Sequence, residues 1–173
     1  MKEVQATLQF DQHSLGDCRQ KKISRMLHAP DGRVMLLPTW WQALMRYAAK
    51  VVNRHHSAVK DIDWDPVIEG TPREYRRYYA QGRYTVHEAF YPGDTIVVHA
   101  VIPATLPLED FQELLRVAGR YRGISPYRKD KRYGTFEVVD VVQKGKEKDG
   151  EACSRPPERA DSDQQSCGLD PLS

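Results

Sequence analysis

The apolar residues of this sequence recur at two spacings, and each spacing predicts one kind of secondary structure. Over residues 4–10 every second residue is apolar, which is typical of a strand with one buried face. Residues 83–90 and 95–102 are rich in β-branched and aromatic side chains and flank a Tyr-Pro-Gly-Asp sequence, so we expect a hairpin. Residues 61–70 predict an edge segment, because Pro66 has no N–H to donate to a neighbouring strand.

Two segments follow the helical spacing and complete the predicted fold. Residues 38–56 place apolar side chains on one stripe and polar ones opposite, with Thr39 as the expected N-cap. Residues 106–119 carry acids in the first turn and end at Gly119, a residue suited to the position after a helix. With a last strand over residues 134–142, the order is strand, helix, strand, strand, helix, strand. We therefore predict an α+β fold of the ferredoxin-like (RRM-like) βαββαβ type, an antiparallel sheet with two helices on one face and extra hairpin insertions.

The segment between the first strand and the first helix holds part of the expected insertions. Residues 11–25 are polar and predict a loop. Within residues 26–37, a Pro-Asp-Gly sequence separates two short apolar runs, which predicts a small hairpin because Pro fixes φ and Gly accepts a positive φ.

A change of composition at residue 143 divides the chain. Residues 1–142 are long enough for one domain with its own core, and they carry 21 cations and 17 acids. Residues 143–173 contain no aromatic residue and carry five cations and seven acids, so they cannot bury enough apolar surface to offset the entropy of ordering. We expect a single ferredoxin-like domain over residues 1–142 and a disordered acidic tail over residues 143–173.

The cysteines and the lack of long apolar runs indicate a compartment. The three cysteines are far apart and form no CxxC pair, which predicts a reducing environment without a disulfide framework or structural zinc. The first residues lack the apolar region of a signal peptide, and nowhere do about 18 apolar residues run together. We expect a cytoplasmic protein that has no membrane partner.

A basic segment follows the second predicted helix. Residues 116–132 contain seven cations and one acid, a local charge of +6 in a chain whose net charge is only +2. Tyrosines adjoin these cations, and Gly123 and Gly134 bracket the centre of the segment, where a ligand could approach the backbone closely. Cations that hold phosphates beside rings that stack on bases are typical of single-stranded nucleic-acid binding, although a solvated connector can also be basic. The candidate binding residues here are Arg120, Arg122, Gly123, Tyr127, Arg128, Lys129, Lys131 and Arg132.

A second basic and aromatic cluster spans residues 73–84, with four arginines, four tyrosines and one glutamate. In a strand, Arg73, Tyr75 and Arg77 would share one face and the intervening residues the other. Tyrosines that pack under arginine stems would give the same composition without a ligand. Because two separate clusters of this kind favour a shared binding groove, we add Arg76, Arg77 and Tyr79 to the candidate binding residues, as the second wall of that groove.

The histidines offer candidates for catalysis. His55 and His56 fall at the end of a predicted helix, and His87 lies on a predicted strand beside Glu88. Their spacing matches no metal-binding motif, so we expect no metal. The sequence also lacks a P-loop, a dinucleotide-binding glycine motif and a nucleophile-elbow serine motif, so we expect no cofactor. A metal-independent endoribonuclease needs a general base and a cation beside the scissile phosphate, a role open to His55, His56 or His87.

The end of the predicted domain resembles a known family. Gly123, the following cations, Tyr133-Gly134 and the Phe-Glu-Val at residues 136–138 are similar to the glycine-rich loop of the RAMP superfamily of CRISPR-associated RNA-binding proteins. The same segment also resembles the end of a group of small uncharacterised phage-encoded proteins. The RAMP resemblance implies a ferredoxin-like domain that binds RNA or assembles into a ribonucleoprotein complex.

Three functional interpretations remain open on the sequence. The first is a non-enzymatic module that binds single-stranded RNA, as a free protein or beside other protein subunits of a ribonucleoprotein complex. The second is a metal-independent endoribonuclease with a histidine base. The third is a phage-encoded interaction factor that mimics or inhibits a CRISPR-type subunit.

Overall fold

The computed structural model describes residues 1–20, 23–126 and 133–145. Five candidate residues of the basic segment lie outside the described residues: Tyr127, Arg128, Lys129, Lys131 and Arg132. The predicted tail lies outside them as well, from residue 146 onward.

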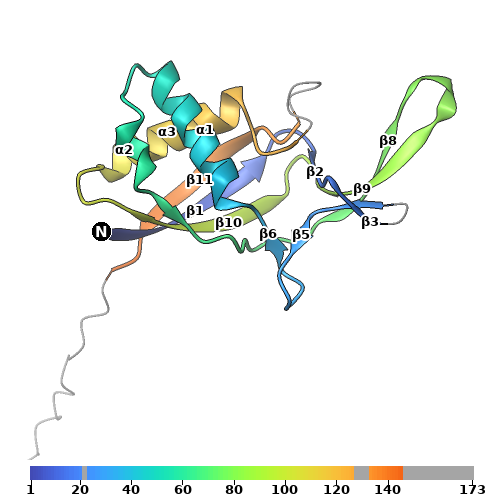
Figure 1. The fold of residues 1–173 in the computed structure, drawn as a ribbon, viewed down its shortest axis with the longest axis horizontal. Helices are drawn as coiled ribbons and strands as arrows, with labels where there is room; N and C mark the ends of the chain where they lie inside the picture. The colour runs from blue at the N-terminus through green and yellow to red at the C-terminus, as the bar shows by residue number, and fades with distance from the viewer. Residues whose placement is uncertain (21–22, 127–132, 146–173) are drawn as a thin grey trace, which may run out of the picture.

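A four-stranded sheet forms one layer of the molecule (Figure 1). Its strands are β1 (Lys2–Phe10), β7 (Asp63–Trp64), β10 (Thr95–Ile102) and β11 (Phe136–Gln143), in the spatial order β11-β1-β10-β7. Every neighbouring pair is antiparallel. The period-two pattern of the first strand is confirmed, since the side chains of alternate residues from Val4 to Phe10 are buried.

Two long helices cover one face of this sheet. They are α1 (Pro38–Val51) and α3 (Leu108–Tyr121), and a short helix α2 (Ser57–Lys60) follows α1. The buried stripes of α1 and α3 join the buried face of β1 in one hydrophobic core. The expectation of a mixed α+β fold with an antiparallel sheet is confirmed at this level.

The ends of both helices differ from the prediction. α1 begins directly after Leu37 without a side-chain cap, so Thr39 is not its N-cap; Pro38 in the first turn already has a fixed φ and lacks an N–H. α3 does not end at Gly119. It continues to Tyr121, and Gly123 takes the left-handed position after the helix with φ +68° and an N–H bond to Ala118 O.

Gly119 instead lies where α3 approaches β11 most closely. A Cβ at this position would lie 2.3 Å from the carbonyl oxygen of Phe136 and 2.6 Å from its ring. Glycine is therefore required at this position because α3 and β11 pack closely together. In the sequence, a glycine near the end of a helix looks the same whether it caps the helix or permits close packing.

A second sheet is formed by segments that lie, in the sequence, between the strands and helices of the main layer. It contains β2 (Ser14–Leu15), β3 (Cys18–Gln20), β4 (Ile23–Arg25), β8 (Arg73–Tyr78) and β9 (Tyr84–Phe90). The prediction of a loop over residues 11–25 was wrong, because three short strands form there and pair with β9 or with each other. The small hairpin was correct: β5 (Leu27–His28) pairs with β6 (Val34–Met35).

The hairpin predicted from residues 83–90 and 95–102 is not formed. The turn is present, because the Tyr91 N–H donates to the Asp94 carboxylate at 2.8 Å, but β9 and β10 then enter different sheets. β10 pairs with β1, and β9 pairs with β8 across a turn that contains a short 3-10 helix (Ala80–Gly82). The β8–β9 hairpin, residues 73–90, extends away from the body of the molecule, and we call it the arm (Figure 1).

Candidate nucleic-acid interface

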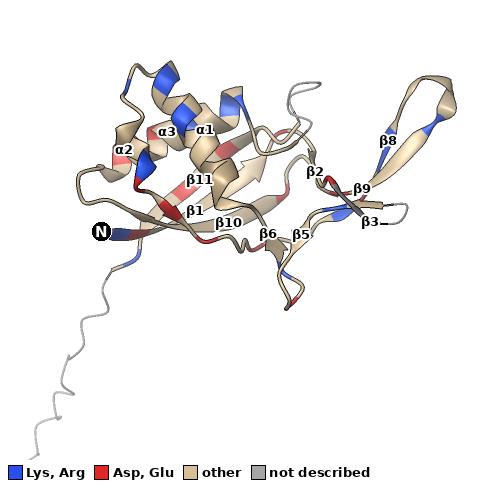
Figure 2. Cartoon of the chain, viewed as in Figure 1, with Lys and Arg blue, Asp and Glu red and all other residues tan. Residues whose placement is uncertain are grey.

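The arm carries arginine and tyrosine side chains on both of its faces. Arg73, Tyr75 and Arg77 share one face with His87 and Thr85 of the opposite strand, as their register shows. Glu74, Arg76 and Tyr78 share the other face with Tyr84. The alternation predicted for this segment is therefore confirmed for the residues of β8. Figure 2 shows Lys and Arg on the arm, where they belong to β8 and to the turn before β9, since β9 itself contains neither.

Arg77 joins the arm to the end of the basic segment. Its guanidinium carbon lies 5.1 Å from the ring centre of Tyr79 and 5.5 Å from that of Tyr133. Tyr133 is buried against Ala89 and Leu15, with Tyr75 packed alongside. The arm thus contacts Tyr133, the residue directly after the basic segment.

Aromatic rings gather where the arm leaves the body, and we call this group the arm base. The ring of His13 lies 4.3 Å from that of Tyr75 and 4.8 Å from that of Tyr91, centre to centre. The Arg73 guanidinium lies 4.3 Å over the Tyr91 ring and donates to Asp94 at 2.7 Å. These contacts fix both the rings and the cation, so the arm base is an ordered surface.

Ionisation at the arm base follows from its partial burial. Burial lowers the pKa of His13, and the Arg73 charge lowers it further, while Asp94 acts in the opposite direction. Burial also raises the pKa of Tyr75, helped by its neighbours Tyr133 and Tyr91. A neutral imidazole and an un-ionised phenol are therefore favoured on this surface.

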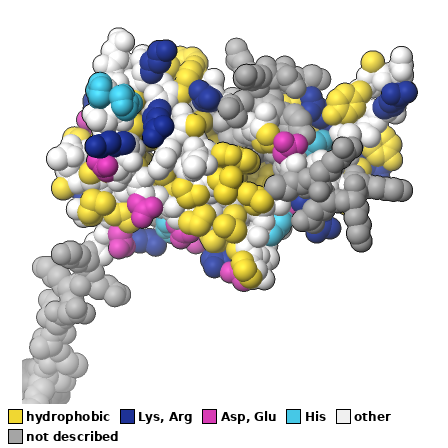
Figure 3. All heavy atoms as spheres, in the orientation of Figure 1, with side chains coloured by type: hydrophobic (Ala, Val, Ile, Leu, Met, Phe, Trp, Pro, Cys, Tyr) yellow, Lys and Arg dark blue, Asp and Glu magenta, His cyan; other side chains and the backbone are white. Residues whose placement is uncertain are grey.

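The outer face of the arm presents rings to solvent. Tyr78 is 63% exposed and Tyr84 is 51% exposed, and their ring centres are 5.6 Å apart. The Arg76 guanidinium carbon lies 5.5 Å from the Tyr84 ring centre. Figure 3 shows apolar and basic side chains side by side on the arm. Exposed rings of this kind can stack on unpaired bases, and the adjacent cation can approach a phosphate.

The uncovered face of the four-stranded sheet has a different character. Its central strands present polar and aliphatic side chains such as Gln5, Thr7 and Val97, opposite the buried residues. One end of this sheet lines a hollow of about 530 Å³ whose walls include four acids and two cations: Glu3, Asp63, Asp65, Glu69, Arg33 and Lys144. The arm is therefore a more favourable site for an anionic polymer than this hollow is.

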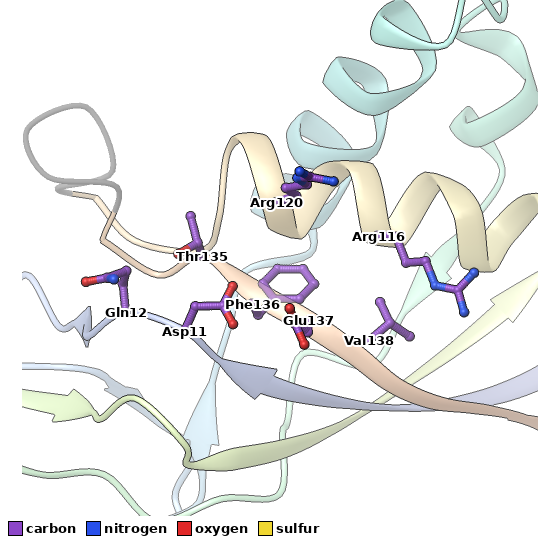
Figure 4. Close-up of a pocket in the computed structure, with 8 residues that line it drawn as sticks. All are labelled: Asp11, Gln12, Arg116, Arg120, Thr135, Phe136, Glu137 and Val138. Atoms are coloured by element: carbon purple, nitrogen blue, oxygen red, sulfur yellow. The ribbon is translucent and has the colours of Figure 1, made fainter.

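The remaining described candidates of the basic segment lie at the end of α3. The Arg122 guanidinium carbon is 5.0 Å from the Tyr47 ring centre, and Gly123 is buried in the turn after the helix. Arg120 and Arg116 line a cavity of about 620 Å³ opposite the carboxylates of Asp11 and Glu137 (Figure 4).

The carboxylates of this cavity influence each other. Burial raises the pKa of Asp11, and the negative charge of Glu137 adds to the effect. Arg120 thus has acids on the opposite wall of its cavity, and the arginines of the arm have acidic neighbours as well, since Arg73 pairs with Asp94 and Arg76 with Glu74.

The structure separates the three candidate histidines. His87 is only 1% exposed, and its ring nitrogens lie 3.0 Å from Gly16 O and 2.8 Å from Thr85 Oγ1, so it contacts the protein interior and not a substrate surface. His55 and His56 are exposed after the end of α1, where their ring centres are 4.2 Å apart.

Sequence reasoning did not find two residues of the arm base, His13 and Tyr91. His13 stands in a polar stretch, and Tyr91 belongs to a turn motif, so no local pattern distinguishes them. Their proximity depends on the pairing of β9 with β2 and β8, which is a long-range property.

The described residues contain no group of three or more His, Cys, Asp or Glu side chains arranged to hold a metal ion. Among their helices, none combines the length and the apolar character that a membrane crossing requires. Comparison of the sequence with models of protein families and with curated proteins gives no match.

Proposed function

We propose that this protein binds single-stranded RNA along the arm and the arm base. The observation that carries the proposal is the contact of the Arg77 guanidinium with two rings, that of Tyr79 on the arm and that of Tyr133 directly after the basic segment. Arginines would neutralise phosphates, and exposed tyrosines would stack on bases.

The exposure of the rings favours a single strand over a duplex. Bases inside a duplex are already stacked on each other, whereas Tyr78 and Tyr84 offer open faces to unpaired bases. The sheet surface supports the same choice of site, because the central strands carry no Phe, Tyr or Trp side chain on their uncovered face within the described residues.

We further propose that the scaffold is a ferredoxin-like domain. The strand order β11-β1-β10-β7, with α1 between β1 and β7 and α3 between β10 and β11, supports a split βαβ arrangement. The resemblance of residues 123–138 to the RAMP glycine-rich loop agrees with an RNA ligand and with assembly beside protein subunits.

The test is the affinity for a fluorescently labelled 15-nucleotide single-stranded RNA, measured by anisotropy at fixed salt. The double variant Arg76→Gln, Arg77→Gln should weaken binding by about tenfold or more. The matched control Arg33→Gln, Lys60→Gln removes the same charge from exposed positions outside the arm and should change affinity by less than about threefold. Thermal unfolding of each variant shows whether the fold is retained.

Several outcomes would overturn the proposal. Equal losses in the two double variants would indicate a non-specific charge effect, and tighter binding to the matching duplex would exclude stacking on unpaired bases. If no RNA binds the full chain at low salt, the proposed function is wrong.

A second candidate function is metal-independent RNA cleavage, and the position of His13 favours it. His13 lies beside Tyr75 and Tyr91 at the arm base, with Arg73 over the Tyr91 ring, and its lowered pKa favours the neutral base. Cleavage of labelled RNA in EDTA should then be lost in His13→Gln and retained in His55→Gln. RNA that stays intact with the unmodified protein would exclude this candidate.

A further inference from the structure

A second cationic surface lies at the end of α1, remote from the arm in the overall arrangement (Figure 1). A hollow of about 380 Å³ opens there, and its walls contain basic and neutral polar side chains without an acid. The lining residues are Arg46, Lys50, Asn53, Arg54, His55 and His56. Figure 3 shows histidine side chains beside Lys and Arg side chains over this end of the helix bundle.

Arg46 and Lys50 supply charge that the described part of the chain does not neutralise. They are exposed and lie one helical turn apart on α1, a helix whose sequence contains no acid. Neither takes part in an ion pair among residues 1–20, 23–126 and 133–145. Two like charges held on one helix face repel each other, and a bound anion would relieve that repulsion.

Arg54 also lines the hollow, but its charge is paired within the protein. Its guanidinium donates two hydrogen bonds to the Asp110 carboxylate of α3, at 2.5 and 2.7 Å. Asn53 ends the helix in the left-handed conformation with φ 56°, and this turn carries the chain from α1 to the two histidines. The backbone and Arg54 are thereby held in place around the unneutralised cations.

His55 is arranged as a hydrogen-bond donor even when it is neutral. Its Nδ1 accepts from the Ser57 N–H at 3.3 Å, and the Ser57 hydroxyl lies 2.8 Å from the same atom. Because a backbone N–H can only donate, Nδ1 holds a lone pair, and the proton of the neutral ring is on Nε2. The exposed ring therefore presents an N–H to solvent, beside the ring of His56.

We propose that this hollow is a phosphate-binding site. A phosphate dianion would receive hydrogen bonds from the Arg46 guanidinium, the Lys50 ammonium and the His55 Nε2–H. The carbonyl end of α1 opposes an anion, but that effect falls off within the last turn and is smaller than the attraction of two unneutralised cations. The phosphate could belong to a free phosphate compound or to the end of a nucleic acid, and both present the same oxyanion.

The experiment is a titration of the full chain with inorganic phosphate, followed through the imidazole signals of His55 and His56 by NMR at constant pH and ionic strength. Saturable shifts in these two histidines are expected. The double variant Arg46→Gln, Lys50→Gln should weaken binding by at least about tenfold, whereas Arg33→Gln, Lys60→Gln removes the same charge elsewhere and should leave it unchanged.

Two RNA hexamers distinguish the sources of the phosphate. If His55 and His56 shift more with a 5′-phosphorylated hexamer than with its 5′-hydroxyl form, the ligand is the end of a nucleic acid. If the two hexamers give equal shifts while inorganic phosphate binds saturably, the ligand is a free phosphate compound. Non-saturable shifts that sodium chloride reproduces, or equal losses in both double variants, would overturn the site. Because the arm variants are not used, the result does not depend on the function proposed for the arm.

Discussion

The indole rings of Trp41 and Trp64 stack face to face in the core, with their centres 4.5 Å apart and their planes at 9°. This contact joins α1 to β7, the short edge strand of the main sheet. Trp41→Ala should therefore lower the free energy of unfolding by about 3–5 kcal/mol, measured by urea denaturation. The neighbouring Trp40 is 39% exposed, and Trp40→Ala should cost only about 1 kcal/mol. Equal costs would contradict the central role of the stack.

The close approach of Gly119 to β11 makes a second prediction about stability. In Gly119→Ala the new Cβ would meet the Phe136 carbonyl oxygen at 2.3 Å, so α3 must move, at a cost of about 3 kcal/mol or more. Gly93→Ala is the matched control. Gly93 has φ +88° but open space around it, so only backbone strain of about 1–2 kcal/mol is expected. Thermal unfolding of the two variants would rank them, and a larger loss for Gly93→Ala would contradict the packing argument.

Charge and stacking on the arm should be separable in RNA binding. Removing two phosphate contacts with Arg76→Gln, Arg77→Gln should make the slope of log K against log salt shallower by about 1.4. Tyr78→Ala, Tyr84→Ala should weaken binding by about 1–3 kcal/mol per base that is no longer stacked and leave the slope unchanged. Tyr121→Ala removes a comparably exposed ring from α3 and serves as the control. A change of slope in the tyrosine variant would contradict this division of roles.

The contact between His28 and Glu88 predicts a pH-dependent contribution to stability. The pKa of His28 is raised, chiefly by its hydrogen bond to Glu88 and next by its bond to Gly32 O. The contribution is therefore fully present below the unfolded value of about 6.5, while Glu88 is ionised, and it is lost as pH rises through the folded value.

The measurement compares the unmodified protein with His28→Gln by urea denaturation at about pH 6 and pH 8. The advantage of the unmodified protein should be larger at the lower pH. NMR titration of His28 in Glu88→Gln should give a lower pKa than in the unmodified protein. An advantage that grows with pH would contradict the assigned direction.

Local patterns were sufficient for the parts of the fold that depend on near neighbours. The alternation in β1, the turn between β5 and β6, and the apolar stripes of α1 and α3 are each set by residues close in sequence. The partner of β9 was not predictable in this way, because the two strands that flank a turn need not pair with each other and either can pair with another exposed edge. Here Phe10 N–H bonds to Asp94 O and Gly93 N–H to Phe10 O, so the turn is attached to the end of β1 while β9 departs.

The candidate interface, too, could be predicted from the sequence only where it depends on residues close in sequence. The alternation of Arg and Tyr in β8 could be predicted from the sequence because it depends only on the period of a strand. The meeting of Arg77 with Tyr133 could not, since the two residues lie far apart in the sequence and are brought together by the small core beside the second sheet. His87 was ambiguous for a related reason: its burial follows from a contact with Gly16, far away in sequence.

The second sheet is built from chain inserted between consecutive elements of the main sheet, and its aromatic cluster is separate from the main core. Substitutions at exposed arm positions such as Arg76, Tyr78 and Tyr84 should therefore have little effect on the packing of α1 and α3 against β1, whereas Phe90 at the end of the arm belongs to the main core. Descendants of this sequence could exchange the side chains of the arm, and with them their ligand preference, while natural selection keeps the scaffold nearly constant. At the exposed positions of the arm, folding therefore places little constraint on evolutionary change.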